Sequence, residues 1–233
     1  MKLKDQGLYL SEFEHDNCGA GFICSLNGER TNTIISKALN ILTCLEHRGA
    51  VSSDGRTGDG AGILIEIPHD FFKKQCDFNL PKANKKQELE IIGWRDVPVN
   101  SKVVGSIASK TQPTIKQVFI KPKDSKLNEK QFNLKLFVAR KISENIIYNS
   151  ELSQSEFFYF SSLSLRTIIY KGLLIPEDIE RFYTDLTNKD LVTKLALVHQ
   201  RFSTNTFPTW DLAQPFRYMC HNGEINTFKG NIS

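Results

Sequence analysis

Cys18 is the residue whose position most directly suggests chemistry, because it is followed by glycines at the start of an apolar run. If residues 1–17 were removed, Cys18 would carry both its thiol and a free α-amine. An α-amine has an ordinary pKa of about 7.7–8.0, so near neutral pH it could take the proton of the thiol on its own residue. Gly19 and Gly21 have no Cβ and would let a substrate carbonyl approach the backbone. The pattern predicts a nucleophile that supplies its own base; the alternative is a small buried cysteine at the start of a strand.

A second set of polar residues follows two apolar segments near the other end of the sequence. Arg201 and Thr204 come after a strand predicted over residues 195–199, and Asn222 and Gly223 come after a strand predicted over 216–220. An asparagine amide beside an unobstructed glycine N–H could supply the two donors of an oxyanion hole. An arginine is suited to holding a carboxylate with two parallel hydrogen bonds. The alternatives are a type I′ turn at Asn222-Gly223 and a surface ion pair at Arg201.

The rest of the sequence predicts the elements that would have to hold these two groups. Apolar runs predict a buried strand over residues 19–26 and another strand over 61–67, and helical spacing predicts a helix from an N-cap at Asn32 to a C-cap at Gly49. Residues 52–60 are expected to form a loop, which lacks the Gly-Lys-Ser/Thr ending of a P-loop. Further strands are expected over 117–120, 134–139, 157–163 and 167–170, short helices after Pro68 and Pro176, and a solvated helical face within 77–92.

Composition limits the classes of function. The chain has 233 residues, 40% of them hydrophobic, which suffices for a substantial core, and its net charge of +4 comes without a basic, aromatic-interleaved stripe. This argues against nucleic-acid binding. Five scattered cysteines without a CxxC pair favour a reducing compartment and argue against a disulfide framework and a metal site. No apolar run approaches the length of a membrane span, and residues 1–17 lack the apolar region of a secretory signal.

Several longer motifs together resemble a known family. They are Asp16-Asn17-Cys18-Gly19, Glu46-His47-Arg48-Gly49, Thr57-Gly58-Asp59-Gly60-Ala61-Gly62, Gly93-Trp94-Arg95, the run from His199 to Thr206, and His221-Asn222-Gly223-Glu224-Ile225-Asn226. In this order they are similar to the amino-terminal glutaminase domain of glutamate synthases, which are class II (N-terminal-nucleophile) glutamine amidotransferases. The resemblance implies an α+β fold, the four-layer αββα sandwich of two antiparallel sheets, incomplete at the C-terminus. It also implies a leader over residues 1–17 that is removed on maturation, and the N-terminal part of the glutaminase domain over 18–233.

The resemblance assigns roles to the polar residues. Cys18 would become the N-terminal residue and attack the side-chain amide of L-glutamine, forming a glutamyl thioester as ammonia leaves. Arg201 would pair with the glutamine α-carboxylate, and Thr204 would line the substrate pocket. Asn222 and the N–H of Gly223 would form the oxyanion hole. The family also uses an aspartate downstream of the Asn-Gly pair to hold the α-amino group, and we expect that residue to lie beyond Ser233.

The resemblance also implies what lies beyond the glutaminase site. Ammonia would pass to a distant flavin site, where 2-oxoglutarate is converted to glutamate. FMN and an iron–sulfur cluster are expected in the full-length family protein and not in this segment, which by itself is expected to be inactive. The electron donor is either ferredoxin or a small subunit that oxidises NAD(P)H, and the expected location is the cytoplasm or the plastid stroma. Two alternatives stay open: a class II amidotransferase that feeds ammonia to a different acceptor, and a non-catalytic truncated domain.

Overall fold

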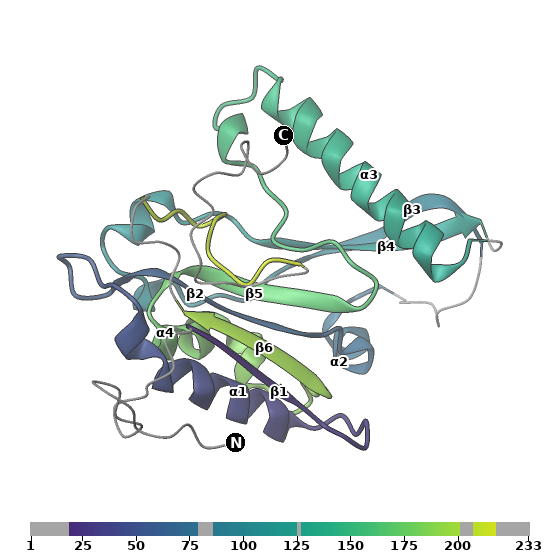
Figure 1. Cartoon of the computed structure of the whole chain (residues 1–233). Helices are drawn as coiled ribbons and strands as arrows, with labels where there is room; N and C mark the ends of the chain where they lie inside the picture. The colour runs from purple at the N-terminus through teal and green to yellow at the C-terminus, as the bar shows by residue number, and fades with distance from the viewer. Residues whose placement is uncertain (1–18, 79–85, 125–126, 201–206, 218–233) are drawn as a thin grey trace, which may run out of the picture.

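The computed structural model describes residues 19–78, 86–124, 127–200 and 207–217. The helices and strands within them are β1 (Ala20–Cys24), α1 (Asn32–Cys44), β2 (Thr57–Glu66), α2 (His69–Gln75), β3 (Lys86–Asp96), β4 (Lys116–Asp124), α3 (Glu129–Tyr148), β5 (Thr167–Leu174), α4 (Pro176–Phe182) and β6 (Leu195–Gln200). The strands form a four-stranded sheet in the order β1-β6-β2-β5 and a two-stranded sheet of β3 and β4 (Figure 1). Every pairing is antiparallel. The α+β class and the two antiparallel sheets are therefore confirmed.

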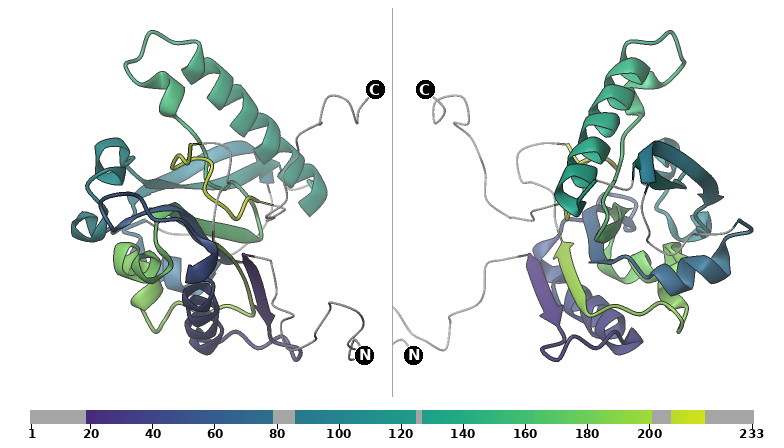
Figure 2. Two further views of the ribbon diagram at one scale, coloured as in Figure 1. Left: turned by 60° about the vertical axis from the view of Figure 1, so that its left-hand side comes forward. Right: turned by 90° about the vertical axis from the view of Figure 1, so that its right-hand side faces the viewer.

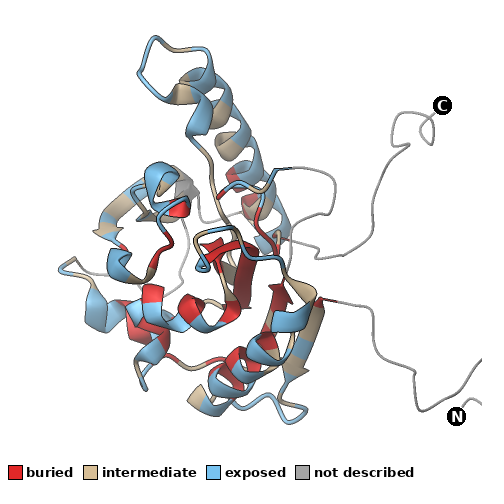
Figure 3. Ribbon diagram, turned by 90° about the vertical axis from the view of Figure 1, so that its left-hand side faces the viewer, coloured by how far each residue is buried: buried red, intermediate tan, exposed pale blue. Residues whose placement is uncertain are grey.

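The core lies between the four-stranded sheet and the helices α1 and α4. One side of α1 is buried, with the spacing of an amphipathic helix: Ile34, Ile35, Ala38, Leu39 and Leu42. α4 begins with Pro176 at its first turn and carries Glu177 and Asp178 there, which suits the positive end of a helix. Figure 3 shows the buried residues gathered on the strands and on the helix faces turned toward them.

The strand β2 lies at the centre of this arrangement. It pairs with β6 on one side and with β5 on the other, and nine of its ten residues are buried. A strand that is covered on both faces is expected to be apolar throughout, as residues 61–65 are. β1 is different, because within the described residues it pairs with β6 alone and Phe22 is 57% exposed. The prediction that β1 is a buried strand is therefore wrong for its outward face.

A buried ion pair ties the β3–β4 hairpin to the core. The guanidinium of Arg95 on β3 donates to both carboxylate oxygens of Asp185, at 2.8 and 2.6 Å, and lies 5.6 Å from the ring centroid of Phe72. The Tyr170 hydroxyl donates to the same carboxylate at 3.1 Å, and Gln117 of β4 accepts from Arg95 at 2.7 Å. Both charged side chains are at least nine-tenths buried. Such a pair must be fully hydrogen-bonded to persist in an apolar setting.

The helix α3 lies at the opposite end of the molecule from α1 (Figures 1 and 2). It begins at a capping box, in which the side chain of Asn128 accepts from the backbone of Gln131 and the side chain of Gln131 accepts from the backbone of Asn128. Phe132 and Leu136 are its buried residues, four positions apart. The strand predicted over 134–139 is therefore wrong: alternation over a few residues was misleading, and the capping box with the four-residue spacing was the better signal.

Other local predictions are wrong for related reasons. The loop expected over 52–60 becomes strand at Thr57, where β2 begins. In the Lys/Glu-rich piece within 77–92, residues 86–92 belong to β3, where Glu90 pairs across strands with Lys121 at 3.1 Å. Residues 79–85 lie outside the described residues. Residues 157–163 form no strand. Phe157 ends a short 3₁₀ turn that begins at Ser155, and the residues after it are irregular. The strand predicted over 216–220 lies largely outside the described residues.

The ends of α1 also differ from prediction. Thr31 is the N-cap, while Asn32 turns its side-chain amide to the carbonyls of Asn188 and Leu191, at 3.2 and 2.9 Å. Gly49 follows a short 3₁₀ turn and has φ −89°, so it is not a left-handed cap. Its lack of a side chain leaves room for the side-chain amide of Gln200.

The Arg95–Asp185 pair yields a stability prediction. Replacing Arg95 with Met leaves Asp185 buried without its cation, so we expect the free energy of unfolding to fall by about 3–5 kcal/mol. The double variant R95M/D185L removes both charges and should recover most of that loss. Urea unfolding of each variant measures the effect. The matched control is K116M, which breaks the exposed Lys116–Asp96 pair of the same hairpin and should cost less than about 1 kcal/mol. An equal loss from both single variants would contradict the role given to Arg95.

Candidate active site

The beginning of β1 and the end of β6 are joined by a backbone hydrogen bond. The N–H of Gln200 donates to the carbonyl of Gly19 at 2.7 Å, and the pairing continues inward from Ala20 opposite His199. In the sequence, Cys18 precedes Gly19 and Arg201 follows Gln200. The structure therefore brings together the chain neighbours of two residues that the sequence predicts to act on one substrate. Cys18, Arg201, Thr204, Asn222 and Gly223 themselves lie outside the described residues, and their roles stay predictions.

The strand β2 extends this junction on the other side of β6. Ala61 lies opposite Gln200 and Gly62 lies opposite His199. His199 is fully buried and Gln200 is 1% exposed, so the last two residues of β6 are enclosed rather than part of a surface loop. A strand end held between two neighbouring strands is a rigid support for the residues that follow it.

Gly49 belongs to this junction through close packing. A Cβ built at Gly49 would lie 1.9 Å from Nε2 of Gln200 and 2.9 Å from its Cδ, so the amide of Gln200 occupies the space that any larger residue would need. The motif residues 46–49 and the residues before Arg201 are thus in contact. The sequence singled out both motifs but contained no signal that they touch.

Asp59 is a further polar residue at this end of β2, and sequence reasoning gave it no role. Its side chain is 6% exposed, and its N–H donates to the carbonyl of Ala50 at 3.0 Å, next to Gly49. Carboxylates are rarely buried unless they serve a structural or chemical purpose. Its place in the Thr57–Gly62 motif was the only sequence signal that could have marked it.

The turn before β2 is organised by Asp54. Its carboxylate accepts from the hydroxyl and the N–H of Thr57, at 2.7 and 2.8 Å, and from the N–H of Ile107 at 2.9 Å. These hydrogen bonds, led by that of the Thr57 hydroxyl, hold the pKa of the Asp54 carboxyl well below its usual range. The Gly/Asp-rich motif is therefore a fixed turn that positions Thr57 and the strand leading to Asp59.

The segment 207–217 packs against β2 and β5. At Gly62 a Cβ would lie 2.5 Å from the carbonyl oxygen of Gln214 and 3.0 Å from Cδ of Pro215. The indole N–H of Trp210 donates to the carbonyl of Ala108 at 3.1 Å, and Arg217 donates to Asn133 of α3 at 2.9 Å. This segment follows the predicted Arg201 and Thr204 in the chain and precedes Asn222 and Gly223.

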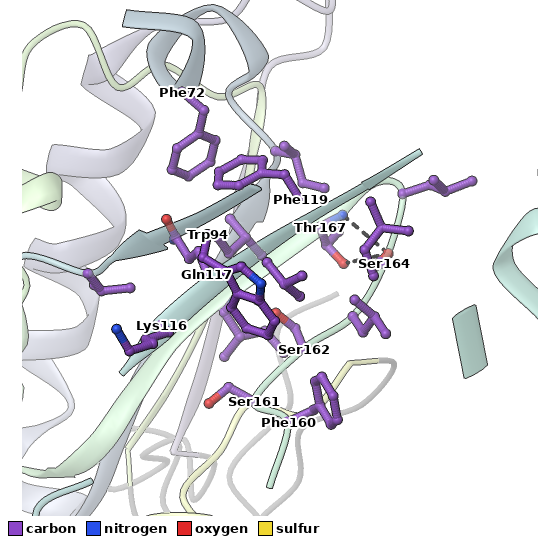
Figure 4. A pocket seen from close by; sticks show the side chains of 18 of the residues that line it. Phe72, Trp94, Lys116, Gln117, Phe119, Phe160, Ser161, Ser162, Ser164 and Thr167 are labelled. Atoms are coloured by element: carbon purple, nitrogen blue, oxygen red, sulfur yellow. Dashed lines mark hydrogen bonds between the residues drawn. The ribbon is translucent and has the colours of Figure 1, made fainter. Parts of the chain in front are cut away.

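A large apolar cavity lies elsewhere, with a volume of about 1400 Å³. It is bounded by the β3–β4 hairpin, α2 and residues 157–168, and Figure 4 shows Phe72 and Phe119 side by side in its wall. Their ring centroids are 5.6 Å apart. Gly19, His199 and Gln200 do not line it, so this cavity and the strand junction are separate features.

The described residues do not fit an iron–sulfur cluster or another metal centre. Within them no three His, Cys, Asp or Glu side chains gather closely enough to hold an ion. Cys24 is on β1, Cys44 ends α1 and Cys76 follows α2, and none of the three forms a disulfide. No helix in this part of the chain is both long and apolar enough to cross a bilayer.

Comparison with known proteins places the chain in a family. The family model described as glutamine amidotransferases class-II matches residues 18–85 and 75–233. The chain belongs to the class II glutamine amidotransferases. Its fold is accordingly that of the N-terminal-nucleophile hydrolases, as the resemblance implied.

Several glutamate synthases are among the curated relatives that the chain matches. The chain is 45% identical to the glutamate synthase [NADPH] large chain of Bacillus subtilis, over 99% of this chain and 17% of that protein. It is 40% identical to the glutamate synthase [NADH] of Saccharomyces cerevisiae, over 97% of this chain and 12% of the relative. It is also 40% identical to the chloroplastic ferredoxin-dependent glutamate synthase 2 of Arabidopsis thaliana, over 99% and 16%. The chain thus spans less than a fifth of each relative's length.

Close packing at Gly62 yields a prediction for the junction. Replacing Gly62 with Ala places a methyl group against the backbone of residues 214–215, so we expect that segment to move and the free energy of unfolding to fall by about 1–3 kcal/mol. Urea unfolding and amide hydrogen exchange of residues 207–217 measure the two effects. Gly55→Ala is the control, because Gly55 has φ +69° but open space around it, so strain arises there without displacement. Unchanged exchange over 207–217 in G62A would contradict the assignment.

Proposed function

We propose that this chain is the N-terminal part of an enzyme that hydrolyses the side-chain amide of L-glutamine and uses the ammonia for reductive synthesis of glutamate from 2-oxoglutarate, the glutamate synthase reaction. The observation that carries the proposal is the Gly19–Gln200 hydrogen bond. Consecutive Cα atoms are about 3.8 Å apart, so Cys18 and Arg201 are each tethered within one residue of that bond. Family membership and the glutamate synthase relatives support the choice of substrate.

In the proposed mechanism, Cys18 is the N-terminal residue of the mature chain. Its neutral α-amine takes the thiol proton, and the thiolate attacks the carboxamide carbon of glutamine. The tetrahedral intermediate collapses as the C–N bond breaks, with the α-ammonium returning the proton to the leaving ammonia. Water then cleaves the thioester and releases glutamate. The family model begins its match at residue 18, which supports the proposed division into a leader over 1–17 and a domain from 18 onward.

The other predicted residues would bind negatively charged groups of the substrate and of the reaction intermediate. Arg201 would hold the glutamine α-carboxylate through two parallel hydrogen bonds, with Thr204 beside it. Asn222 and the N–H of Gly223 would donate to the oxyanion that forms when Cys18 attacks. Because Gln200 is buried and paired on both sides, Arg201 starts from a fixed point, which suits a residue that must orient a substrate.

The remaining steps would belong to parts of the enzyme outside these residues. FMN and an iron–sulfur cluster would carry the reduction of the imine formed from ammonia and 2-oxoglutarate. Ferredoxin, or a small subunit that oxidises NAD(P)H, would supply the electrons; the relatives are named for each of these donors. The cytoplasm or the plastid stroma is the proposed location.

The identity of the nucleophile can be tested by mass. The full-length protein should yield a mature chain beginning at Cys18, and a diazo-ketone analogue of glutamine should add once, to that residue. C18S should take no adduct. Cys24→Ser and Cys44→Ser are the matched controls, because both cysteines are exposed and neither is given a role, so these variants should still be labelled. A chain that keeps residues 1–17 and is not labelled at Cys18 would refute the mechanism.

The pH dependence follows from the same base. The α-amine must be neutral to act, so kcat/KM for glutamine should rise with pH through about 7.7–8.0, the ordinary pKa of such an amine. Below that range the amine is protonated and the rate should fall about tenfold per pH unit. Initial rates of ammonia release between pH 6 and 9 measure the profile. A rate that is constant over this range would contradict an α-amine base.

The oxyanion hole and the carboxylate site should separate kinetically. Asn222→Ala removes one oxyanion donor and should lower kcat by about 10²–10³, with little change in KM. Arg201→Lys keeps the charge but loses the second hydrogen bond, so KM for glutamine should rise while kcat changes less. Ammonia release at varied glutamine concentration measures both. Arg56→Lys, at a half-exposed arginine of the turn before β2, is the control and should match the wild type.

A further inference from the structure

Lys171 is a buried cation that the proposed mechanism does not use. It lies on β5 and is 3% exposed, although lysine is almost never fully buried without a partner. Its neighbour Tyr170 packs in the core, so alternation along the strand turns Lys171 to the other face of the sheet. The residue directly opposite on β2 is Gly62. Lys171, Gly62 and His199 thus form one row across the sheet that ends opposite Ala20 on β1.

Two residues of the segment 207–217 hold the Lys171 ammonium. Nζ donates to the carbonyl of Asp211 at 2.6 Å and lies 4.9 Å from the ring centroid of Phe216. The ring of Tyr159 is on another side, at 5.8 Å. A cation over an aromatic face is attracted to the ring, more strongly when both are shielded from water. The Lys171 side chain therefore contacts the segment at two residues, Asp211 and Phe216, that are five positions apart.

Residues 207–217 are the only described part of the chain between the predicted substrate residues and the predicted oxyanion hole. They begin one residue after Thr206 and end at Arg217, five residues before Asn222. In the sequence, residues 201–206 join Gln200, at the buried end of β6, to Phe207. A shift of residues 207–217 would therefore move Phe207, to which residues 201–206 are joined, and Arg217, from which the chain leads to Asn222.

We propose that Lys171 is a positioning residue for glutamine binding: by clasping residues 207–217 against β2 and β5, it fixes the segment that joins the predicted substrate residues to the predicted oxyanion hole in the chain. This inference rests on the proposed function. It extends that function to a residue on a strand that none of the motifs includes.

The Lys171 ammonium can lose its proton within the ordinary range of pH. Burial, as the largest cause, lowers the pKa of the Lys171 ammonium to about 8, with the charge of Arg140 adding to the shift and that of Asp211 opposing it. Titratable or charged side chains surround it on several elements. Asp211 and Arg217 are on the segment 207–217, Arg140 and Glu144 are on α3, and His199 is two strands away on β6. Tyr159 precedes β5, and Tyr183 follows α4 and donates its hydroxyl proton to the Lys171 carbonyl. Above pH 8 the ammonium loses its proton, and the attraction to the Phe216 ring is lost with it.

The test uses the full-length protein with three substitutions. K171M removes the clasp, K171Q keeps a donor for the Asp211 carbonyl but no charge, and K171R keeps the charge. Lys37→Met, at an exposed lysine on α1, is the control. Amide hydrogen exchange of residues 207–217 reports on the segment independently of catalysis, and glutamine-dependent ammonia release between pH 6 and 9 gives KM and kcat.

We expect K171M to speed exchange over 207–217 about tenfold and to raise KM for glutamine by a similar factor, with exchange in α1 unchanged. K171Q should lie between K171M and the wild type. KM of the wild type should rise above pH 8, whereas KM of K171R should stay level. This pattern would establish Lys171 as a positioning residue. A purely structural role would not make the KM of the wild type rise above pH 8 while the KM of K171R stays level.

Three results would overturn the inference. Exchange over 207–217 that is the same in K171M and the wild type would show that Lys171 does not hold the segment. Exchange that rises equally in α1 would show a general loss of stability instead. Faster exchange confined to 207–217, with KM unchanged in K171M, would show a clasp without effect on glutamine. Absence of glutaminase activity in the wild type would refute the proposed function itself, and the exchange data would still decide whether the clasp exists.

Discussion

The pairing of β1 with β6 is the constraint on which the rest of the structure depends. The two strands are separated by most of the described chain, yet their residues pair in continuous register from Ala20 with His199 to Cys24 with Leu195. Closing so long a loop costs conformational entropy, which the burial of β2, α1 and α4 must offset. The pairing also sets the position of Gly19 beside Gln200. Any chemistry by residues attached to these two ends therefore depends on a contact that is non-local in sequence.

Close packing against another segment, rather than chain reversal, explains several of the glycines. Gly49 leaves room for the amide of Gln200, Gly62 for the backbone of residues 214–215, and Gly172 for the ring of Trp210. Each removes a side chain where two segments distant in sequence meet, and each is in or beside the sheet that supports the candidate site. Gly28 and Gly55 differ, because their positive φ angles mark ordinary turns.

Two buried cations hold the remaining parts on this framework, and they do so differently. Arg95 meets the Asp185 carboxylate in a two-point hydrogen-bonded pair, which fixes the β3–β4 hairpin. Lys171 meets a carbonyl and aromatic rings, and burial lowers the pKa of its ammonium to about 8. The first contact suits a permanent support. The second is sensitive to pH, at the segment that leads to the predicted oxyanion hole.

The sequence by itself determined the family, the α+β class and the residues that are candidates for chemistry, because these depend on residue types in a fixed order. It also identified α1, α2 and α4, whose apolar spacing and proline positions are local signals. Tertiary structure decided that residues 57–60 begin a strand, that residues 86–96 pair with β4, and that 134–139 belong to a helix. Short stretches of alternating residues satisfy more than one local pattern, and partners distant in the chain select among them. The same holds for Gly49, Asp59 and Lys171, whose significance lies in what they contact.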